Sequence, residues 1–81
     1  MNMLPKCRTK HAGYTLKKIM KDKNIAVEYL ATRTGTKLMY IQQIIDGKKD
    51  ISPDMAKRLQ YSLGIDASYW INLQAIYDES L

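Results

Sequence analysis

The chain has 81 residues, with 13 Lys and Arg against 8 Asp and Glu, and a net charge of +5. Folding at this length buries only about 60 to 65% of the surface that the unfolded chain exposes, too little for a two-domain enzyme with an interdomain cleft. Residues 1–49 hold 11 basic and 3 acidic side chains, a net of +8, whereas residues 50–81 hold 2 and 5, a net of −3. A small binding module is therefore favoured, with a basic half that faces nucleic acid or an acidic protein, or is simply solvated.

The cysteine content and hydropathy point to the cytoplasm. Cys7 is the single cysteine of the sequence, so no internal disulfide of the kind used by small secreted domains can form. No run approaches the ~20 apolar residues of a membrane span, and the first residues lack the apolar core of a secretion signal. We expect a soluble cytoplasmic protein without a membrane partner.

The predicted elements begin after a flexible arm. Residues 1–12 show no apolar periodicity, so we expect them to form this arm and residues 13–81 to form one domain. A first helix is indicated by Leu16, Ile19 and Met20, which recur at helical spacing, and Asn24 suits the left-handed residue that ends it.

Two short helical patterns follow, separated by a glycine. The first runs from Ile25 to Gly35, and the second has its apolar positions at Leu38, Ile41, Ile44 and Ile45 before Gly47. Two short helices joined by a glycine-containing turn predict a helix-turn-helix unit.

The last two helices have clear start signals. Ser52 is a good N-cap, Pro53 fits the first helical position, and Asp54 lies favourably at the positive end of the helix dipole. This helix is expected to reach Gly64, and Asp66 is expected to cap a fifth one. No segment alternates with period two for long enough to be a strand, so the sequence predicts an all-α fold of five helices.

Three stretches of the chain together resemble one family. They are His11-Ala12-Gly13, then Leu30-Ala31-x3-Gly35-x5-Ile41-x2-Ile44-Ile45-Asp46-Gly47-Lys48, and finally Ile51-Ser52-Pro53-Asp54-Met55-Ala56 with Trp70-Ile71-Asn72-Leu73-Gln74. The pattern resembles the HigA-type antitoxins, a branch of the lambda-repressor-like (XRE) helix-turn-helix proteins, without a gap from residue 11 to residue 78. The resemblance implies a five-helix lambda-repressor-like domain, bacterial or phage-encoded and usually dimeric. It also implies a neighbouring gene for a HigB-like toxin that resembles the RelE-type mRNA endonucleases, with the antitoxin binding this toxin and repressing the shared operon.

The same resemblance makes residues 36–45 the recognition helix, which enters the major groove of DNA. Ile41, Ile44 and Ile45 should face the core. Basic residues around this helix are expected to contact phosphates, their alternative being a solvated loop. The expected DNA-binding residues are Arg33, Thr36, Lys37, Leu38, Met39, Tyr40, Gln42, Gln43, Lys48 and Lys49.

The chain departs from the family pattern on this surface. The family commonly has Ser, Arg and Gln around positions 37 to 39 and Gln near position 27, whereas this chain has Lys37, Leu38, Met39 and Val27. Three explanations compete. Leu38 and Met39 contact thymine methyl groups of a T-rich site, or they form a protein-binding patch, or Leu38 turns inward as part of the core.

The fifth helix carries more apolar surface than a small monomer easily covers, which favours a homodimer with two-fold symmetry and a palindromic operator. Trp70 and Leu73 are better explained as core of the monomer, which makes Ile76 and Tyr77 the better interface candidates of this helix. The expected interface residues are Tyr69, Leu73, Ile76 and Tyr77.

Catalysis has little support in the sequence. Cys7 and His11 lie in the expected arm, where neither a fixed base nor a pocket is available, and His11 is better explained by packing or capping. We expect no enzyme activity, metal or cofactor. Two alternatives to an antitoxin stay open: a stand-alone or phage-type XRE repressor without a toxin, and a protein-only inhibitor or adaptor that has lost DNA reading.

Overall fold

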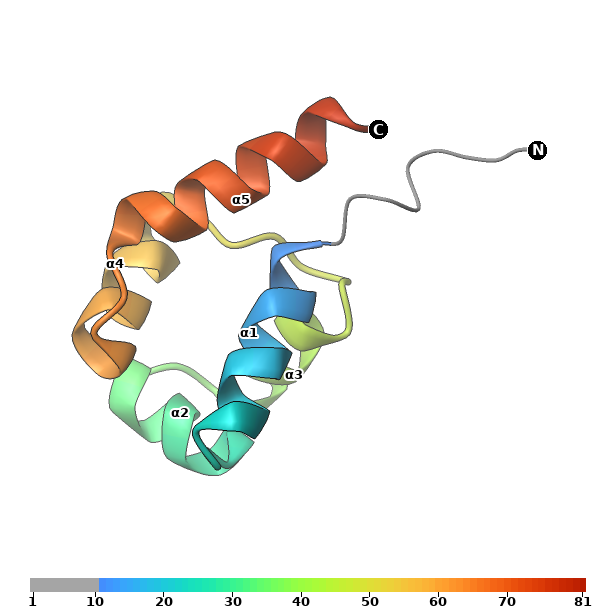
Figure 1. Cartoon of the computed structure of the whole chain (residues 1–81). Coiled ribbons are helices and arrows are strands. Elements are labelled where there is room, and N and C mark those ends of the chain that lie inside the picture. The colour runs from blue at the N-terminus through green and yellow to red at the C-terminus, as the bar shows by residue number, and fades with distance from the viewer. Residues whose placement is uncertain (1–10) are drawn as a thin grey trace.

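The computed structural model describes residues 11–81, and the chain folds into five helices over this range (Figure 1). The expected arm lies outside the described residues except for its last two. No strand occurs within residues 11–81, which confirms the predicted all-α class. The helices are α1 (Ala12–Asp22), α2 (Val27–Thr34), α3 (Leu38–Ile45), α4 (Pro53–Leu63) and α5 (Ala67–Glu79).

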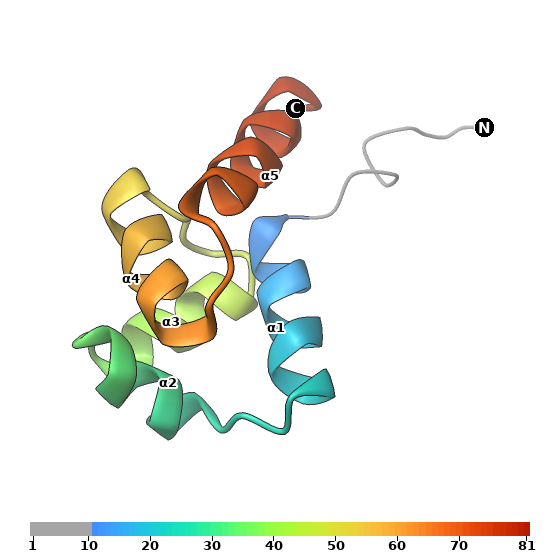
Figure 2. The same ribbon diagram turned by 60° about the vertical axis from the view of Figure 1, so that its left-hand side comes forward.

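The helices surround one apolar core. α3 packs against α1 and α2, α4 packs against α2, and α5 lies across α4 and the N-terminal end of α1 (Figures 1 and 2). None of the five helices of the described part has both the length and the apolarity needed to cross a bilayer. The core is formed by Ala12, Leu16, Met20, Leu30, Ala31, Ile41, Ile44, Ile51, Met55, Ala56, Leu59 and Trp70.

His11 joins three parts of this fold. Its Nδ1 accepts a hydrogen bond of 2.9 Å from the Gly13 N–H and so caps α1, which begins at Ala12, one residue before the expected domain boundary. Its Nε2 lies 3.1 Å from Oδ1 of Asp50, and its ring meets the Tyr77 ring edge-on at 4.9 Å between centroids. The sequence-based interpretation of His11 as a capping and packing residue is confirmed.

Replacing His11 by alanine is expected to lower the free energy of unfolding by about 1 to 2 kcal/mol, because the cap and the ring contact are both lost. Urea-induced unfolding measures this cost. Asp50→Ala is the matched control, since it removes the Asp50 partner and leaves the cap and the contact with Tyr77. Equal costs for the two variants would contradict the assigned role of His11.

The predicted helix ends are largely confirmed. Asn24 and Gly35 adopt the left-handed conformation after α1 and α2, with φ of 58° and 72°. Ser52 Oγ accepts a 3.1 Å hydrogen bond from the Met55 N–H, as expected of an N-cap. Asp66 is the N-cap residue of α5 as expected, but its side chain accepts no hydrogen bond from the helix. Oε1 of Gln60 reaches across from α4 and accepts the Ala67 N–H at 2.8 Å.

Candidate nucleic-acid interface

The inward side of α3 fixes this helix in the fold. Ile41 and Ile44 are fully buried, and Ile45 is half-buried against the core, as predicted. Because α3 is held between α1 and α2, its opposite side is left to solvent in a fixed orientation.

The N-terminus of α3 lies two residues later than predicted. Lys37 is the N-cap in extended conformation, and the helix begins at Leu38. Thr36 still belongs to the turn, since its N–H donates to the Ala31 carbonyl at 3.0 Å and its hydroxyl lies 2.8 Å from that of Thr34. These bonds complete the C-terminal end of α2, so Thr36 cannot also join the next helix.

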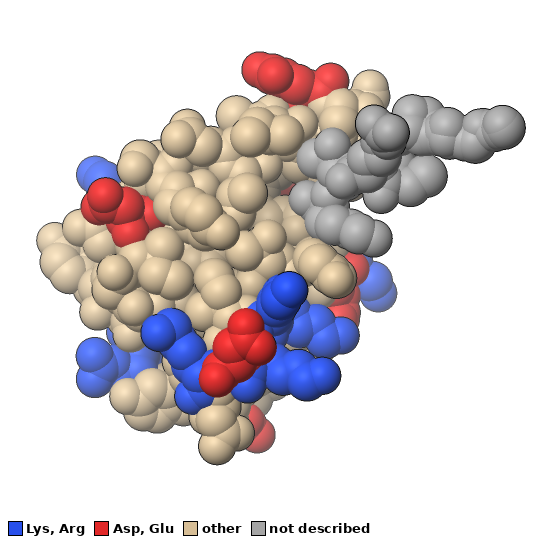
Figure 3. All heavy atoms as spheres, in the orientation of Figure 1, with Lys and Arg blue, Asp and Glu red and all other residues tan. Residues whose placement is uncertain are grey.

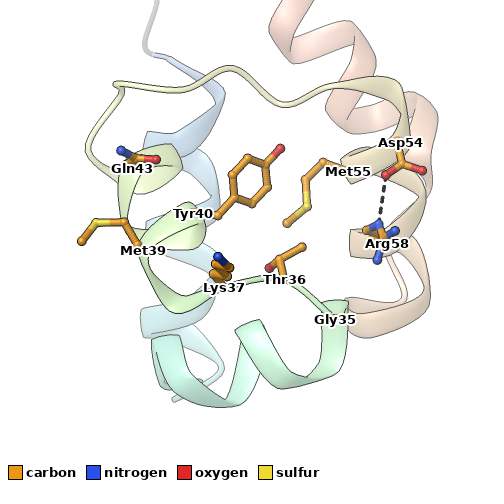
Figure 4. A pocket seen from close by; sticks show the side chains of 9 residues that line it. All are labelled: Gly35, Thr36, Lys37, Met39, Tyr40, Gln43, Asp54, Met55 and Arg58. Atoms are coloured by element: carbon orange, nitrogen blue, oxygen red, sulfur yellow. Dashed lines mark hydrogen bonds and ion pairs between the residues drawn. The ribbon is translucent and has the colours of Figure 1, made fainter.

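Leu38 and Met39 are exposed on the first turn of α3. Their exposed fractions are 45% and 63%, so the explanation that places Leu38 in the core is wrong. Figure 4 shows Met39 projecting outward from α3, away from α4. Of the three explanations, contact with thymine methyl groups and a protein-binding patch are left.

Three polar side chains of the expected interface are already engaged or partly covered. Gln42 Nε2 donates to Asp46 Oδ1 at 3.2 Å, one turn further along the chain. Gln43 and Tyr40 are half-buried, and Nζ of Lys49 lies 5.9 Å from the centre of the Tyr40 ring. The outward surface of α3 therefore offers fewer free hydrogen-bonding groups than its sequence indicates.

A hollow of about 440 Å³ separates the N-terminal turn of α3 from α4 (Figure 4). Arg58 closes it on the α4 side by donating from Nη1 to the Thr34 carbonyl at 2.8 Å and from Nε to Asp54 Oδ2 at 3.0 Å. Arg58 was not predicted, although its spacing of four residues from Asp54 indicates a helical ion pair. The hollow is lined by Gly35, Thr36, Lys37, Met39, Tyr40, Gln43, Asp54, Met55 and Arg58.

Within residues 11–81, exposed basic residues lie near α3 and on the outer side of α1. Lys37, Lys48 and Lys49 are exposed next to the two ends of α3, whereas Arg33 lies over the Tyr29 ring at 5.9 Å on α2. A second group follows the outer side of α1, where Figure 3 shows Lys and Arg side chains gathered. This group comprises Lys17, Lys18 and Lys21, around a shallow hollow.

The outer side of α5 has a partly exposed apolar flank. Tyr69 and Ile76 are 44% and 54% exposed, and Leu73 between them is half-buried. Tyr77 is half-buried by its contact with His11. Trp70 is fully buried, which confirms its assignment to the monomer core.

One exposed apolar residue of α5 was not predicted. Ile71 is 39% exposed on the opposite flank of the helix, where it lines a hollow of about 210 Å³ with Ile51 and Pro53. Within residues 11–81, no three His, Cys, Asp or Glu side chains gather in a way that could hold a metal ion.

Comparison with known proteins identifies the family of this chain. The model for helix-turn-helix domains matches residues 16–70, more than half of the chain. The chain belongs to the helix-turn-helix family. A search of proteins with curated functions finds no significant match.

Three solved structures that this chain resembles are of antidote or antitoxin proteins. A Nostoc punctiforme protein, described as a candidate antidote protein of a plasmid maintenance system, is 33% identical with a TM-score of 0.81, over 86% of this chain and 77% of that one. A HigA-family antidote protein from Coxiella burnetii is 26% identical with a TM-score of 0.81, over 89% and 79%. The Pseudomonas aeruginosa antitoxin HigA with higBA promoter is 28% identical with a TM-score of 0.83, over 88% and 78%. These likenesses confirm the resemblance to HigA-type antitoxins found in the sequence.

Proposed function

We propose that this helix-turn-helix protein is an antitoxin that represses its own operon by binding a palindromic operator with α3. The observation that carries the proposal is the N-terminal turn of α3, which is exposed while Ile41 and Ile44 of the same helix are buried in the core, with exposed lysines next to both ends of the helix. A helix presented in this way fits the major groove, while the lysines meet the phosphates. The similar HigA structure from P. aeruginosa with promoter supports this proposal.

The proposed interface keeps the residues expected from the sequence, with different roles for some of them. Lys37, Lys48 and Lys49 contact phosphates, and Arg33 does so from α2. Thr36 holds the turn in shape, and Tyr40 and Gln43 line the hollow beside α4. Leu38 and Met39 are left to face base edges, and Gln42 could do so only after its hydrogen bond to Asp46 breaks.

The protein binds as a homodimer through α5 in this proposal. Tyr69, Leu73 and Ile76 recur at helical spacing on one flank, and a two-fold axis there would cover this apolar surface. Tyr77 borders the same flank. The two copies of α3 would then lie about one DNA turn apart, ~34 Å.

Ile76→Glu is expected to convert the dimer into monomers, because two carboxylates would face each other across the axis without water. Sedimentation equilibrium measures the change as a halved mass. Tyr61→Glu is the matched control, since Tyr61 is an 83% exposed large side chain on α4 and does not belong to the proposed α5 flank. If Ile76→Glu has the same mass as the unsubstituted chain, this flank is not the interface.

We further propose that the partner protein is a HigB-like toxin of the RelE type, encoded by an adjacent reading frame. Co-expression with the product of that frame, followed by co-purification and a translation assay, tests this directly. Stable co-purification with loss of toxin activity supports an antitoxin. Operator binding without such a partner would favour a stand-alone repressor, and co-purification without any DNA binding would favour a protein-only inhibitor.

A further inference from the structure

We propose that the recognition helix reads its operator through the methyl groups of thymines, which contact Leu38 and Met39. This inference rests on the proposed operator binding and names the base chemistry that it requires. Leu38 and Met39 are the first two residues of α3 and are 45% and 63% exposed. N-terminal residues of a recognition helix are those that reach base edges in the major groove.

The polar side chains near this turn are poorly placed to read bases instead. The hydroxyl oxygens of Thr36 and Thr34 lie 2.8 Å apart inside the turn, within hydrogen-bond distance. Gln42 Nε2 donates a hydrogen bond of 3.2 Å to Asp46 Oδ1. A bidentate contact from Gln42 to adenine would first require this bond to break. Lys37 is exposed as the N-cap residue, and its point charge suits a phosphate next to the groove.

Thymine is the base whose major-groove edge matches an apolar side chain. Its C5 methyl group projects into the major groove, where apolar contacts distinguish it from the other bases. Leu38 and Met39 each expose apolar surface to water. A thymine methyl group in contact with either side chain would remove apolar surface of both the methyl group and the side chain from water, which is favourable. The flexible thioether of Met39 can follow the methyl position without strain in α3.

Deoxyuridine substitution tests the inference, because it removes only the methyl group and keeps the base pairing. The probe is the tightest duplex recovered from a random-sequence selection with the full chain. Its thymines are replaced one at a time by deoxyuridine, and the dissociation constants are compared at one salt concentration. We expect a loss of about four-fold for each contacted methyl group, and about 15-fold when symmetry-related thymines of both half-sites are replaced together.

Met39→Ala and Leu38→Ala locate the effect on the protein. Each variant should bind the thymine duplex more weakly and lose part of the preference for thymine over deoxyuridine. Lys48→Ala is the matched control: it should weaken binding to both duplexes and keep the full preference. Both apolar side chains are exposed, so circular dichroism should show unchanged folding.

The outcomes separate this inference from the proposed function. Tight binding with equal affinity for thymine and deoxyuridine duplexes at every position would overturn the methyl reading and leave operator binding intact. The Leu38 and Met39 surface would then be a protein-binding patch. A full thymine preference in both alanine variants would also overturn it. No selective binding to any duplex would overturn the operator proposal itself, and the methyl reading with it.

Discussion

Gly13→Ala is expected to lower the free energy of unfolding by about 3 kcal/mol, which at this chain length corresponds to a fall in Tm of roughly 15 °C. A Cβ on residue 13 would overlap the backbone carbonyl of Ile44, where α1 meets the C-terminal part of α3. Backbone atoms cannot rotate away as a side chain can. The two helices must therefore separate, and the buried contacts between them loosen.

A second glycine provides the control for this prediction. Gly64 has a φ of 73° and nothing within 4 Å of an added Cβ, so Gly64→Ala measures only the conformational cost, about 1 kcal/mol. Thermal unfolding followed by circular dichroism compares the two variants. If Gly13→Ala is as stable as Gly64→Ala, the close approach of α1 and α3 is not what requires glycine there.

The double variant Lys48→Ala and Lys49→Ala is expected to weaken binding to every DNA sequence and to flatten its salt dependence. Each lost phosphate contact removes about 0.9 from the slope of log affinity against log salt concentration, or about 3.6 for the four contacts of a dimer. The physical reason is that fewer condensed counterions are released on binding. Fluorescence anisotropy with a labelled duplex between 50 and 200 mM salt measures the slope.

Lys17→Ala with Lys18→Ala is the matched control, because it removes the same charge from the outer side of α1. These lysines are exposed on a helix whose other side packs against α3, so a duplex bound to α3 should not reach them. We expect a slope close to that of the unsubstituted chain. Equal flattening in the two double variants would place the DNA on a different or larger surface.

The helices were predictable from the sequence because their limits depend on local chemistry. Gly35 and Asn24 end helices through their own backbone conformations, and Ser52 caps α4 with a side chain three residues away. Asp66 shows the limit of this reasoning. The cap of α5 comes from Gln60, seven residues before the N–H that it accepts, and depends on how α4 and α5 meet.

The position of the candidate site on α3 was predictable from the sequence, but the exposure and the contacts of some of its side chains were not. The apolar spacing of Ile41 and Ile44 placed the outer side of α3 correctly. It could not decide between exposed and buried positions for Leu38, because a residue at the first turn of a short helix lies near the edge of both faces. The contact of Arg58 with the Thr34 carbonyl joins residues 24 positions apart, and no local pattern indicates it.

Hydroxyl-radical footprinting of the full chain on the DNA upstream of its own reading frame tests the operator proposal most directly. Two recognition helices related by a two-fold axis predict two protected half-sites with inverted sequences, centred about 10 base pairs apart. The protection should disappear with the Lys48 and Lys49 double variant. A uniform cleavage pattern at low salt, with the folded chain in excess, would contradict operator binding through α3.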